Sequence, residues 1–472
     1  MTEEQKTTVD FTSISQEDLD HADSQSYVEK YPRGLSEKLI RQISDEKNEP
    51  EWVLNIRLKA FETFQKLKAP KWGPDLSQLD LEEIRYFASP DSDKNQKSWD
   101  DVDPEIKRTF ERLKIPEAER AVLAGVGAQY DSETVYHNIK PEWEDKGVIF
   151  EDFDVAIQKY PELVRKYFSK CIPINDHKFA ALHYAIFSGG TFLYIPTGVT
   201  VTQPLQAYFR MNAKNGGQFE HTLIVVEDEA EAEYIEGCSA PKFGSNSLHA
   251  GGVELYVGEN ARARYSSVEN WSADTYNLNT KRSIVKKGGK VEWVGGNLGS
   301  GTTMLYPCSV LVGDNARAEH LGIAFANAGQ NQDTGAKIII NGKNCRASVI
   351  SKSLSKGGGI STYRGLLDVK KTAENAIITV ECDALMLDEK SVSDTIPVIQ
   401  VENDSAQINH EASAGKISDE VLLYFESRGI DEETAKGMIV NGFLDEVVKT
   451  LPLEYAGELN RLIELEMEGS IG

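Results

Sequence analysis

Apolar and polar residues alternate with a period of two along most of the chain beyond about residue 147, and a turn signature interrupts the alternation at regular intervals. Residues Val257–Ala263, Val312–Ala318 and Asn341–Ala347 share this signature: a glycine, an asparagine two residues later, and then a small residue. With weaker copies included, the first residue after the turn falls at positions 230, 261, 290, 316, 345, 376 and 406. A spacing of about 30 residues is typical of repeat architectures.

Each repeat is predicted to contain two short strand arms around a turn and no helix. Such units leave unpaired edges on their own, but when they are stacked as coils each arm pairs with the same arm of the next coil. We therefore predict a mainly β fold, a parallel β-helix, which is right-handed because parallel crossover connections nearly always are. A β-sandwich is the alternative, but its strands recur every ~8–12 residues without a longer repeat.

Helical patterns flank the repeats on both sides. After Pro50, the apolar residues of 51–67 recur at spacings of three and four, which predicts an amphipathic helix. Beyond the last repeat, Ser418 and Asp431 are suited to cap two further helices. The predicted domains are an N-terminal helical domain at 1–146 with a polar loop at 88–104, a parallel β-helix core at 147–415, and a C-terminal helical domain at 416–472 that docks on the β-helix or on another protein.

Charge and cysteine content narrow the functional classes. The net charge is −24, from 75 acidic and 51 basic residues, and such a surface repels nucleic-acid phosphates and anionic membranes. The N-terminus lacks a basic segment followed by an apolar run, and no apolar stretch approaches the ~18 residues of a membrane span. We therefore expect a cytoplasmic protein. Its five scattered cysteines should be free thiols, and without a Cys-x-x-Cys pair they form no closed structural zinc site.

Strand parity suggests the first candidate chemistry. Counted in steps of two from the small residue after each turn, Cys382 points into the β-helix, and so does His410 of the following coil. Adjacent coils lie ~4.8 Å apart and two residues along a strand span ~6.6 Å, so the thiol and the imidazole are predicted neighbours. Glu411 has the opposite parity and lies where the repeat ends. These three groups suit iron, although parity alone favours a buried thiol and an end cap.

The other cysteines fall at separate places. Cys238 is flanked by glycine, serine and proline, which predicts a nearby bend. Five repeats separate it from Cys382, so the two thiols are predicted to be ~24 Å apart and could serve only as successive stations. Cys345 occupies the small inward slot after a turn, and we assign it to the core together with Cys171 and Cys308.

Short motifs in a fixed order run along nearly the whole chain. They are Asn48–Trp52, Arg57–Ala60, Pro161–Tyr167, Ile235–Pro241, Asn270–Trp271, Thr280–Arg282, Ser361–Gly365, Glu381–Asp383, His410–Ala412, Arg428–Ile430 and Met438–Phe443. Each motif is weak alone, but together they closely resemble the SufB/SufD family of SUF iron–sulfur cluster assembly proteins, and SufB in particular.

The resemblance implies a scaffold rather than an enzyme. Nucleotide hydrolysis would be supplied by a SufC-type ATPase docked on the C-terminal helices, and a SufD-type subunit or a second copy of the chain would pair with it. A sulfur donor and apoprotein recipients complete the implied partners. Cys238 would accept persulfide sulfur, and Cys382 with Glu411 and His410 would hold a transient 4Fe-4S or 2Fe-2S cluster at the subunit interface. The residues implied to line the sulfur route are Arg210, Asn212, Glu269, Trp271 and Lys281.

Some positions depart from the family pattern, and other functions remain open. Glu269 stands where relatives often have glutamine, and Asp394 where they often have histidine. The alternatives are a SufD-like structural subunit without its own cluster chemistry, a polysaccharide lyase, which the charge of −24 opposes, and a purely structural β-helix. A Walker-like spacing at 296–303 has Thr302 where a lysine must bind phosphate, so this chain is not expected to hydrolyse nucleotides.

Overall fold

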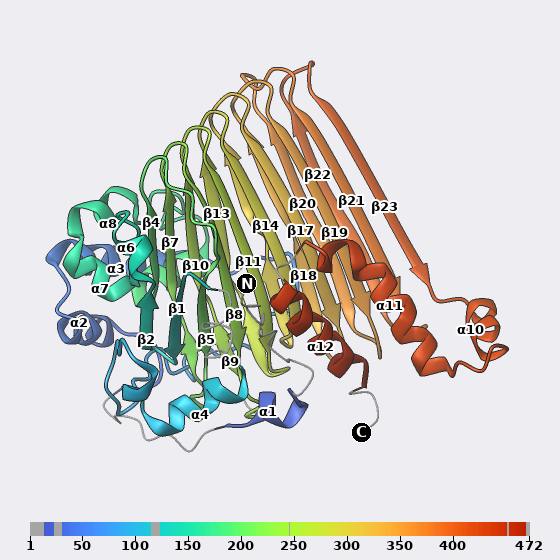
Figure 1. The fold of residues 1–472 in the computed structure, drawn as a ribbon, viewed down its shortest axis with the longest axis horizontal. Coiled ribbons are helices and arrows are strands. Elements are labelled where there is room, and N and C mark those ends of the chain that lie inside the picture. The colour runs from blue at the N-terminus through green and yellow to red at the C-terminus, as the bar shows by residue number, and fades with distance from the viewer. Residues whose placement is uncertain (1–13, 23–30, 115–122, 245, 451–452, 469–472) are drawn as a thin grey trace, which may run out of the picture.

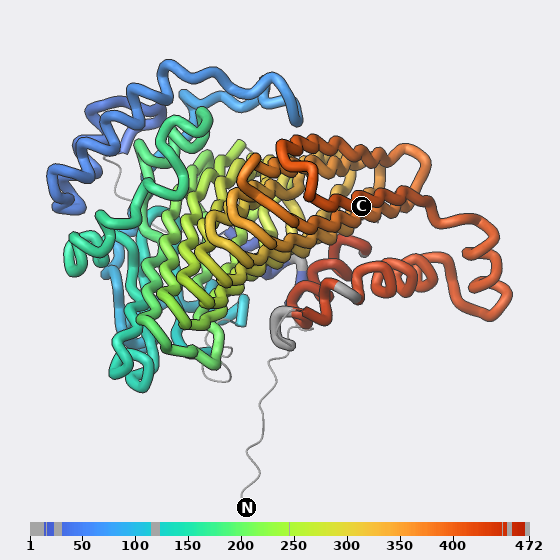
Figure 2. The backbone as a smooth tube through the Cα atoms, turned by 90° about the horizontal axis from the view of Figure 1, so that it is seen from above, coloured from blue at the N-terminus to red at the C-terminus, as the bar shows by residue number. Residues whose placement is uncertain are grey.

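The computed structural model of the chain describes residues 14–22, 31–114, 123–244, 246–450 and 453–468. Its centre is a solenoid of about 8 turns built from two long, mainly parallel sheets (Figure 1). Seen from above, the coils follow one another along the long axis, with helices beside both ends (Figure 2). This arrangement confirms the predicted mainly β fold, a parallel β-helix with N-terminal and C-terminal helices.

One sheet joins ten strands and contains the arm that follows each predicted turn. Its order is β2 (Glu133–Ile139), β1 (Gly125–Tyr130), β5 (Leu205–Arg210), β8 (Glu231–Ser239), β11 (Arg262–Trp271), β14 (Lys290–Gly299), β17 (Arg317–Ala326), β19 (Arg346–Ser355), β21 (Ile377–Met386) and β23 (Gln407–Lys416). Apart from the antiparallel hairpin of β1 and β2, neighbouring strands are parallel. Equivalent residues of successive coils therefore stack on one another.

The second sheet joins thirteen strands and forms the opposite wall. Its main path is β3 (Ile149–Asp152), β4 (Gly190–Ile195), β7 (His221–Val226), β10 (Gly252–Val257), β13 (Thr280–Val285), β16 (Cys308–Leu311), β18 (Asn331–Ile340), β15 (Thr302–Leu305), β12 (Thr275–Asn277), β9 (Ser247–His249) and β6 (Gly217–Gln218). In the later coils β20 (Ile360–Val369) pairs with β18, and β22 (Val392–Val401) pairs with β20. Because β18 pairs with both β15 and β16, two short rows of strands merge there into one long row.

Asparagine or glycine sets the turn of most coils. Asn260, Asn315 and Asn344 have φ of 53°, 60° and 56°, the left-handed region that asparagine tolerates. In the coil between the first two of these, Gly288 has φ of 67° and takes the same place. The strand of that coil begins at Lys290. Its small residue after the turn is therefore the glycine at 289, one position earlier than the sequence pattern indicated.

The first domain differs from the helical domain expected at 1–146. The hairpin of β1 and β2 lies before that boundary, and β1 runs parallel to β5, so the hairpin extends the ten-stranded sheet. Conversely, helices occupy much of 153–186, and the first coil starts only at Gly190. Every residue of β1 is buried. A short segment buried on both faces shows no alternation, and its periodicity therefore gives no strand signal.

Most of the helices lie against the outside of the solenoid, and α10 projects from it (Figure 1). The helices of the described ranges are α1 (Gln16–Asp20), α2 (Glu37–Glu46), α3 (Glu51–Lys66), the 3-10 turn η2 (Trp99–Asp101), α4 (Pro104–Arg112), α6 (Pro141–Glu144), α7 (Phe153–Lys159), α8 (Pro161–Tyr167), α9 (Lys178–Ile186), α10 (Asp419–Glu426), α11 (Glu432–Val448) and α12 (Leu453–Glu468). The helix predicted over 51–67 is thus confirmed as α3. In the segment 88–104, η2 and the first residue of α4 are the only helical residues, in keeping with the predicted loop.

Two apolar layers attach these helices to the sheets. Helices α3, α7 and α9 share a buried cluster with Leu223 and Val225 on the outer face of β7. Helices α11 and α12 share another with Val294 and Ile323 on the outer face of the ten-stranded sheet. The expected docking of the C-terminal helices on the β-helix therefore holds for α11 and α12. No helix in the described ranges is long and apolar enough to cross a membrane.

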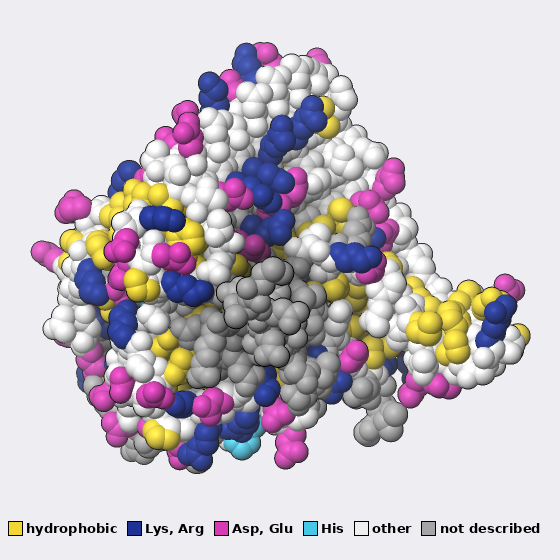
Figure 3. All heavy atoms as spheres, viewed as in Figure 1, with side chains coloured by type: hydrophobic (Ala, Val, Ile, Leu, Met, Phe, Trp, Pro, Cys, Tyr) yellow, Lys and Arg dark blue, Asp and Glu magenta, His cyan; other side chains and the backbone are white. Residues whose placement is uncertain are grey.

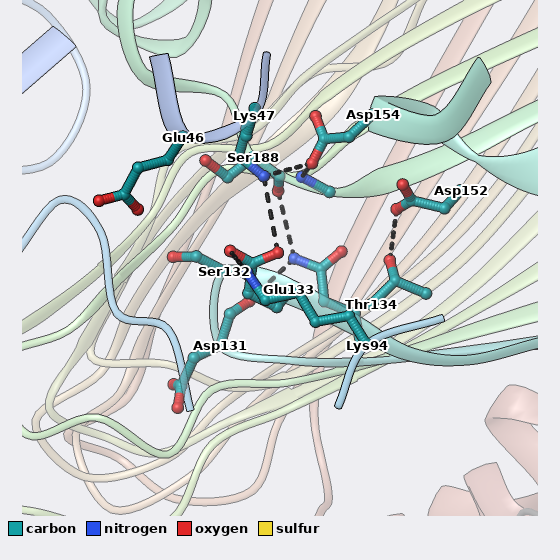
Figure 4. A network of polar contacts seen from close by, with 12 residues as sticks. Glu46, Lys47, Lys94, Asp131, Ser132, Glu133, Thr134, Asp152, Asp154 and Ser188 are labelled. Carbon is teal, nitrogen blue, oxygen red and sulfur yellow. Dashed lines mark hydrogen bonds and ion pairs between the residues drawn. The ribbon is translucent and has the colours of Figure 1, made fainter. Parts of the chain in front are cut away.

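A buried ion-pair network fastens the N-terminal helices to the sheets (Figure 4). Lys47, directly after α2, pairs with Asp154 of α7, and its Nζ lies 3.7 Å from a carboxylate oxygen of Glu133 in β2. Lys94 approaches the other oxygen of Glu133 at 2.8 Å. Burial alone would lower the pKa of Lys47, but the two carboxylates raise it above its ordinary value. The network thus joins three elements that are distant in the sequence.

Candidate functional site

The first candidate region lies inside the solenoid around Cys238. Alternation along β8 turns Glu236 and Cys238 toward the lumen. Cys238 is 1% exposed and lies opposite Glu269 of β11 and Phe209 of β5. The side chain is therefore enclosed by neighbouring coils rather than displayed on a bend.

A chain of polar contacts crosses the lumen beside this thiol. Lys281 Nζ lies 2.6 Å from Glu269 Oε1, and Asn277 Nδ2 donates to Glu269 Oε2 at 2.6 Å. The ring of His249 places Nδ1 3.0 Å from Asn277 Oδ1 and Nε2 2.6 Å from Glu220 Oε1. All five side chains belong to residues that are at most 3% exposed. Since both ring nitrogens of His249 face oxygen acceptors, the contacts favour the imidazolium form.

These contacts offset the cost of burying charge. Burial alone would raise the pKa of Glu269, but Lys281 and His249 bring it below its ordinary value. Burial would likewise lower the pKa of Lys281 and of His249, whereas Glu269 raises the first and Glu220 the second. The lumen thus contains two buried ion pairs.

Trp271 completes the wall of this region. Its ring centroid lies 4.2 Å from that of His249. It belongs to the apolar cluster that fills the solenoid, and its Nε1 is buried without a hydrogen-bond partner. The structure therefore brings three of the residues implied for the sulfur route, Glu269, Trp271 and Lys281, into one region with Cys238.

Glu236 is a carboxyl group in contact with the thiol. Its Oε1 lies 3.9 Å from Cys238 Sγ, accepts a 2.5 Å hydrogen bond from the hydroxyl of Tyr265, and lies 3.9 Å from Lys281 Nζ. Burial raises the pKa of Glu236 to about 7, although Lys281 opposes the rise. Burial, followed by the charges of Glu236 and Glu269, holds the pKa of Cys238 well above its ordinary value. The thiol is therefore protonated at neutral pH.

Arg210 and Asn212 are not part of this lumenal group. Arg210 lies one residue beyond the inward-facing Phe209, so parity turns it to the outer face of the sheet. Its guanidinium donates to Ser239 Oγ at 3.0 Å and to the carbonyl of Leu19 at 2.9 Å. Asn212 lies past the end of β5, where its backbone N–H donates to Asp131. Arg210 thus links the residue after Cys238 to the N-terminal segment.

The second candidate region lies at the far end of the solenoid around Cys382. Along β21, Ile378, Val380, Cys382 and Ala384 are buried, and the residues between them are more exposed, which confirms the predicted inward parity. Cys382 is 4% exposed. Burial raises its pKa to about 12, although a hydrogen bond with Tyr363 of β20 opposes the rise.

His410 and Glu411 occupy opposite faces of the last strand. His410 of β23 lies opposite Val380, two residues before the partner of Cys382, which is the offset predicted from parity. Its ring centroid is 6.5 Å from that of Tyr363, and its Nε2 is buried without a hydrogen-bond partner. Glu411 is exposed and accepts a hydrogen bond from Asn409. Because β23 continues as a regular strand to Lys416, Glu411 keeps the outward parity.

The cluster ligands that the resemblance implies, Cys382, His410 and Glu411, are therefore not gathered at one point within this chain. Across the described residues, no three His, Cys, Asp or Glu side chains lie close enough together to hold a metal ion. Cys382 and His410 share the inner face, whereas Glu411 lies on the outer one. A cluster at this place would need further donors from outside the chain or a rearranged last coil.

The two regions share one lumen. Followed from strand to strand, the register aligns Cys238 with Ala384, two residues beyond Cys382. Five ladder steps separate β8 from β21, which corresponds to ~24 Å at ~4.8 Å per step. A cavity of about 70 Å³ lies between, and its lining includes Tyr265 and Lys281 from the early coils and Tyr363 from a late coil. That volume holds a few water-sized groups.

Sequence reasoning missed three acidic or basic members of the first region: Glu220, Glu236 and His249. Glu236 was within reach, because it precedes Cys238 by two residues and must share its face. A carboxyl group on the inner face of a β-helix is itself a signal, since buried acids are seldom left unpaired. For the other two no such signal existed, because they lie outside the clear repeats.

Comparisons with known proteins agree with this architecture. The family model for the SufBD protein N-terminal region matches residues 27–207, and the model for the SUF system FeS cluster assembly SufBD core domain matches residues 209–443. Iron-sulfur cluster assembly SufBD family proteins of Staphylococcus saprophyticus and of Staphylococcus aureus strain MRSA252 are 51% identical to this chain over 440 residues, which is 93% of this chain and 94% of each relative. The chain is therefore a member of the SufBD family of iron–sulfur cluster assembly proteins.

Proposed function

We propose that this chain is the scaffold subunit on which iron–sulfur clusters are assembled de novo, taking up sulfur at Cys238 and building a transferable cluster beside Cys382. One observation carries the proposal: both thiols face the same lumen, nearly in register, with a cavity between them. Sulfur taken up in the early coils then reaches the late coils without crossing bulk water. Glu269, Trp271 and Lys281 line the start of that route, and Arg210 and Asn212 hold its outer wall.

The end of the route suits a cargo that must leave again. Cys382 supplies a thiolate once its proton is displaced, and His410 supplies a buried imidazole nitrogen that has no other partner. Thiolate and imidazole both bind iron, and a stable storage site would use four thiolates. A site with few ligands therefore releases a 2Fe-2S or 4Fe-4S cargo more readily. Glu411 joins the ligand set once contact with a second subunit turns the last strand.

A second subunit covers the open end of the solenoid. Among the described residues, β22 pairs only with β20 and β23 only with β21, so each strand leaves one edge free. Five apolar side chains of β22 are 39% to 46% exposed: Val392, Ile396, Val398, Ile399 and Val401. Free edges of this kind pair with other chains. The partner is a SufD-type subunit or a second copy of this chain, and its donors complete the cluster ligands.

The ATPase partner binds at α10. This helix projects from the body of the molecule and contains no buried residue (Figures 1 and 2). Val421, Leu423 and Tyr424 are 42%, 65% and 56% exposed, and apolar side chains cover this projection (Figure 3). Such a patch marks a protein interface. Through it, a SufC-type ATPase moves the C-terminal helices and with them the end of β23, which opens and closes the cluster site.

One observation favours the alternative of a SufD-like structural subunit. The Cys382 thiol is buried with a raised pKa, and Glu411 faces away from it. In that alternative the chain closes the open end of another scaffold and binds no cluster itself. The retention of cysteine at both 238 and 382 speaks for the scaffold role.

Anaerobic reconstitution tests the proposal. The chain is incubated with its ATPase, ferrous iron, cysteine and a cysteine desulfurase, and visible absorbance is recorded with iron and sulfide content. Wild type is expected to gain both iron and sulfide, and Cys382→Ala to lose most of the cluster. Cys345→Ala is the matched control, because Cys345 is buried at a turn away from both regions. Equal cluster content in Cys382→Ala and wild type would refute the role of Cys382, whereas a wild type that gains neither iron nor sulfide would overturn the scaffold proposal in favour of the SufD-like role.

A further inference from the structure

The lumen beside Cys238 contains an odd number of ionisable partners. Glu220, Glu236, Glu269, His249 and Lys281 come from different strands or their ends, and all are at most 3% exposed. Lys281 pairs with Glu269 at 2.6 Å and His249 pairs with Glu220 at 2.6 Å. This arrangement leaves Glu236 without a close ion-pair partner, since its nearest cation, Lys281, is 3.9 Å away and already engaged.

The surroundings hold Glu236 in place without neutralising it. Tyr265 donates to Oε1 at 2.5 Å, and Thr222 donates to Oε2 at 3.3 Å. Tyr234 is the other titratable group facing it, and its hydroxyl donates to Thr191. A buried carboxyl group with hydrogen bonds but no cation of its own exchanges its proton near neutral pH, and burial does raise the pKa of Glu236 to about 7.

The neighbouring thiol needs a group of this kind. Sulfur attacks as the thiolate, and the pKa of Cys238 lies well above its ordinary value because of burial and the nearby carboxylates. Lys281 does not relieve this, because it is engaged with Glu269. The Sγ of Cys238 lies 3.9 Å from Oε1 of Glu236, within reach of a thiol hydrogen bond. The proton of the thiol therefore has a short path to Glu236.

We propose that Glu236 is the base that accepts the proton of the Cys238 thiol as sulfur is transferred to it. This inference rests on the proposed function, because it assumes that Cys238 takes up sulfur. The co-reactant is a sulfane-sulfur donor, either a protein persulfide or a small inorganic disulfide. Cys238 Sγ bonds to the outer sulfur of the donor, and the sulfur–sulfur bond of the donor breaks. The thiol proton moves to Glu236 and then to the departing sulfur.

The step balances without an oxidant or a reductant. With hydrogen disulfide as the donor, a thiol and HS–SH give a persulfide and H₂S. The sulfane sulfur changes its carrier, and one sulfur–sulfur bond replaces another. Glu236 returns to its starting state. A base placed in this way typically accelerates proton transfer by 10²–10⁴-fold.

The test measures persulfide formation at Cys238 as a function of pH. The full chain is treated anaerobically with sodium disulfide between pH 6 and 9, quenched with an alkylating reagent, and the Cys238 peptide is quantified by mass spectrometry. In wild type the rate is expected to rise through about pH 7. In Glu236→Gln that rise should be absent, and the rate at pH 8 should fall at least tenfold. The ratio of the two rates cancels the ionisation of the reagent.

Two further variants separate this role from a structural one. Glu233→Gln is the matched control: the same substitution in the same strand, three residues earlier and on the outer face. It should leave the rate at Cys238 unchanged. Glu236→Asp retains a carboxyl group at a longer distance, so it should keep the rise through neutral pH at a reduced rate. A loss of structure would abolish the pH dependence in both Glu236 variants.

The outcomes distinguish the inference from the function on which it rests. If wild type forms no persulfide at Cys238, the proposed sulfur uptake fails. If wild type forms it and Glu236→Gln follows the same rate profile, sulfur uptake stands and the role of Glu236 is refuted. A tenfold loss confined to Glu236→Gln supports both.

Discussion

Replacing Glu236 by glutamine should change how the stability of the protein depends on pH. The substitution keeps the shape of the side chain and removes one ionisable group that is 1% exposed. The pKa of Glu236 is raised from an ordinary value of 4.5 to about 7 by burial in the folded chain. A difference of roughly 2.5 units corresponds to about 3 kcal/mol of folding free energy, since one unit corresponds to 1.36 kcal/mol.

The sign of the effect follows from proton binding. Between pH 4.5 and about 7 the folded chain retains a proton on Glu236 that the unfolded chain has released. Stability therefore falls as pH rises through this window. The contribution is fully present below pH 4.5 and is lost above about pH 7. Glutamine has no such dependence, so the variant should gain on wild type by about 2.5 kcal/mol between pH 5 and pH 8.

Urea denaturation at pH 5, 6, 7 and 8 under reducing conditions measures this gain. The quantity compared is the free energy of unfolding of Glu236→Gln minus that of wild type, so all other titrating groups cancel. Any cost of fitting the amide is the same at each pH and shifts the curve without changing its slope. A difference in unfolding free energy that stays constant from pH 5 to pH 8 would mean that Glu236 is fully charged in the folded lumen. That result would refute the raised pKa of Glu236 on which this prediction rests.

Three further changes test separate parts of the molecule. Lys281→Met should lower the free energy of unfolding by about 3–5 kcal/mol in urea at pH 8, because it leaves buried carboxylates without their cation. The loss should be clearly smaller when Glu269→Gln is also present. Equal losses in both backgrounds would contradict the ion pair between Lys281 and Glu269. Val398→Asp on β22 should lower the mass of the assembled subunit pair in light scattering, whereas Val312→Asp, equally exposed at a turn, should not. Leu423→Ala on α10 should weaken binding of the ATPase at least tenfold by calorimetry, and unchanged affinity would place the ATPase elsewhere.

Regular spacing made much of the solenoid predictable. A turn built on asparagine or glycine recurs in most coils, and the strand after it alternates inward and outward side chains. Parity alone therefore places Cys238 and Cys382 on the inner face, and it fixes the two-residue offset between Cys382 and His410. The reason is local: the side-chain period of a strand is two, and a parallel stack repeats it without change.

The same reasoning assigns Arg210 to the outer face when it is applied to β5. Resemblance had grouped this residue with the lumenal set, but its position next to Phe209 turns it away from the lumen. Its contact with the carbonyl of Leu19 involves residues far apart in sequence. The resemblance named these residues as candidates, whereas the backbone geometry determines on which side of the sheet each one lies.

The coil repeat, the parity of its strands and the family to which the chain belongs all follow from the amino-acid sequence. Which buried charges meet is evident only in the folded chain, because Glu220, Glu236, His249 and Lys281 lie on different strands or at their ends and their spacing in the chain has no relation to their distance in the lumen. The tertiary structure also decided that the last coil ends with free edges and that Glu411 faces outward. The local period of two determines to which face of the sheet a side chain points. Which residues of different coils lie close together, and where the described stack of coils ends, are properties of the whole solenoid.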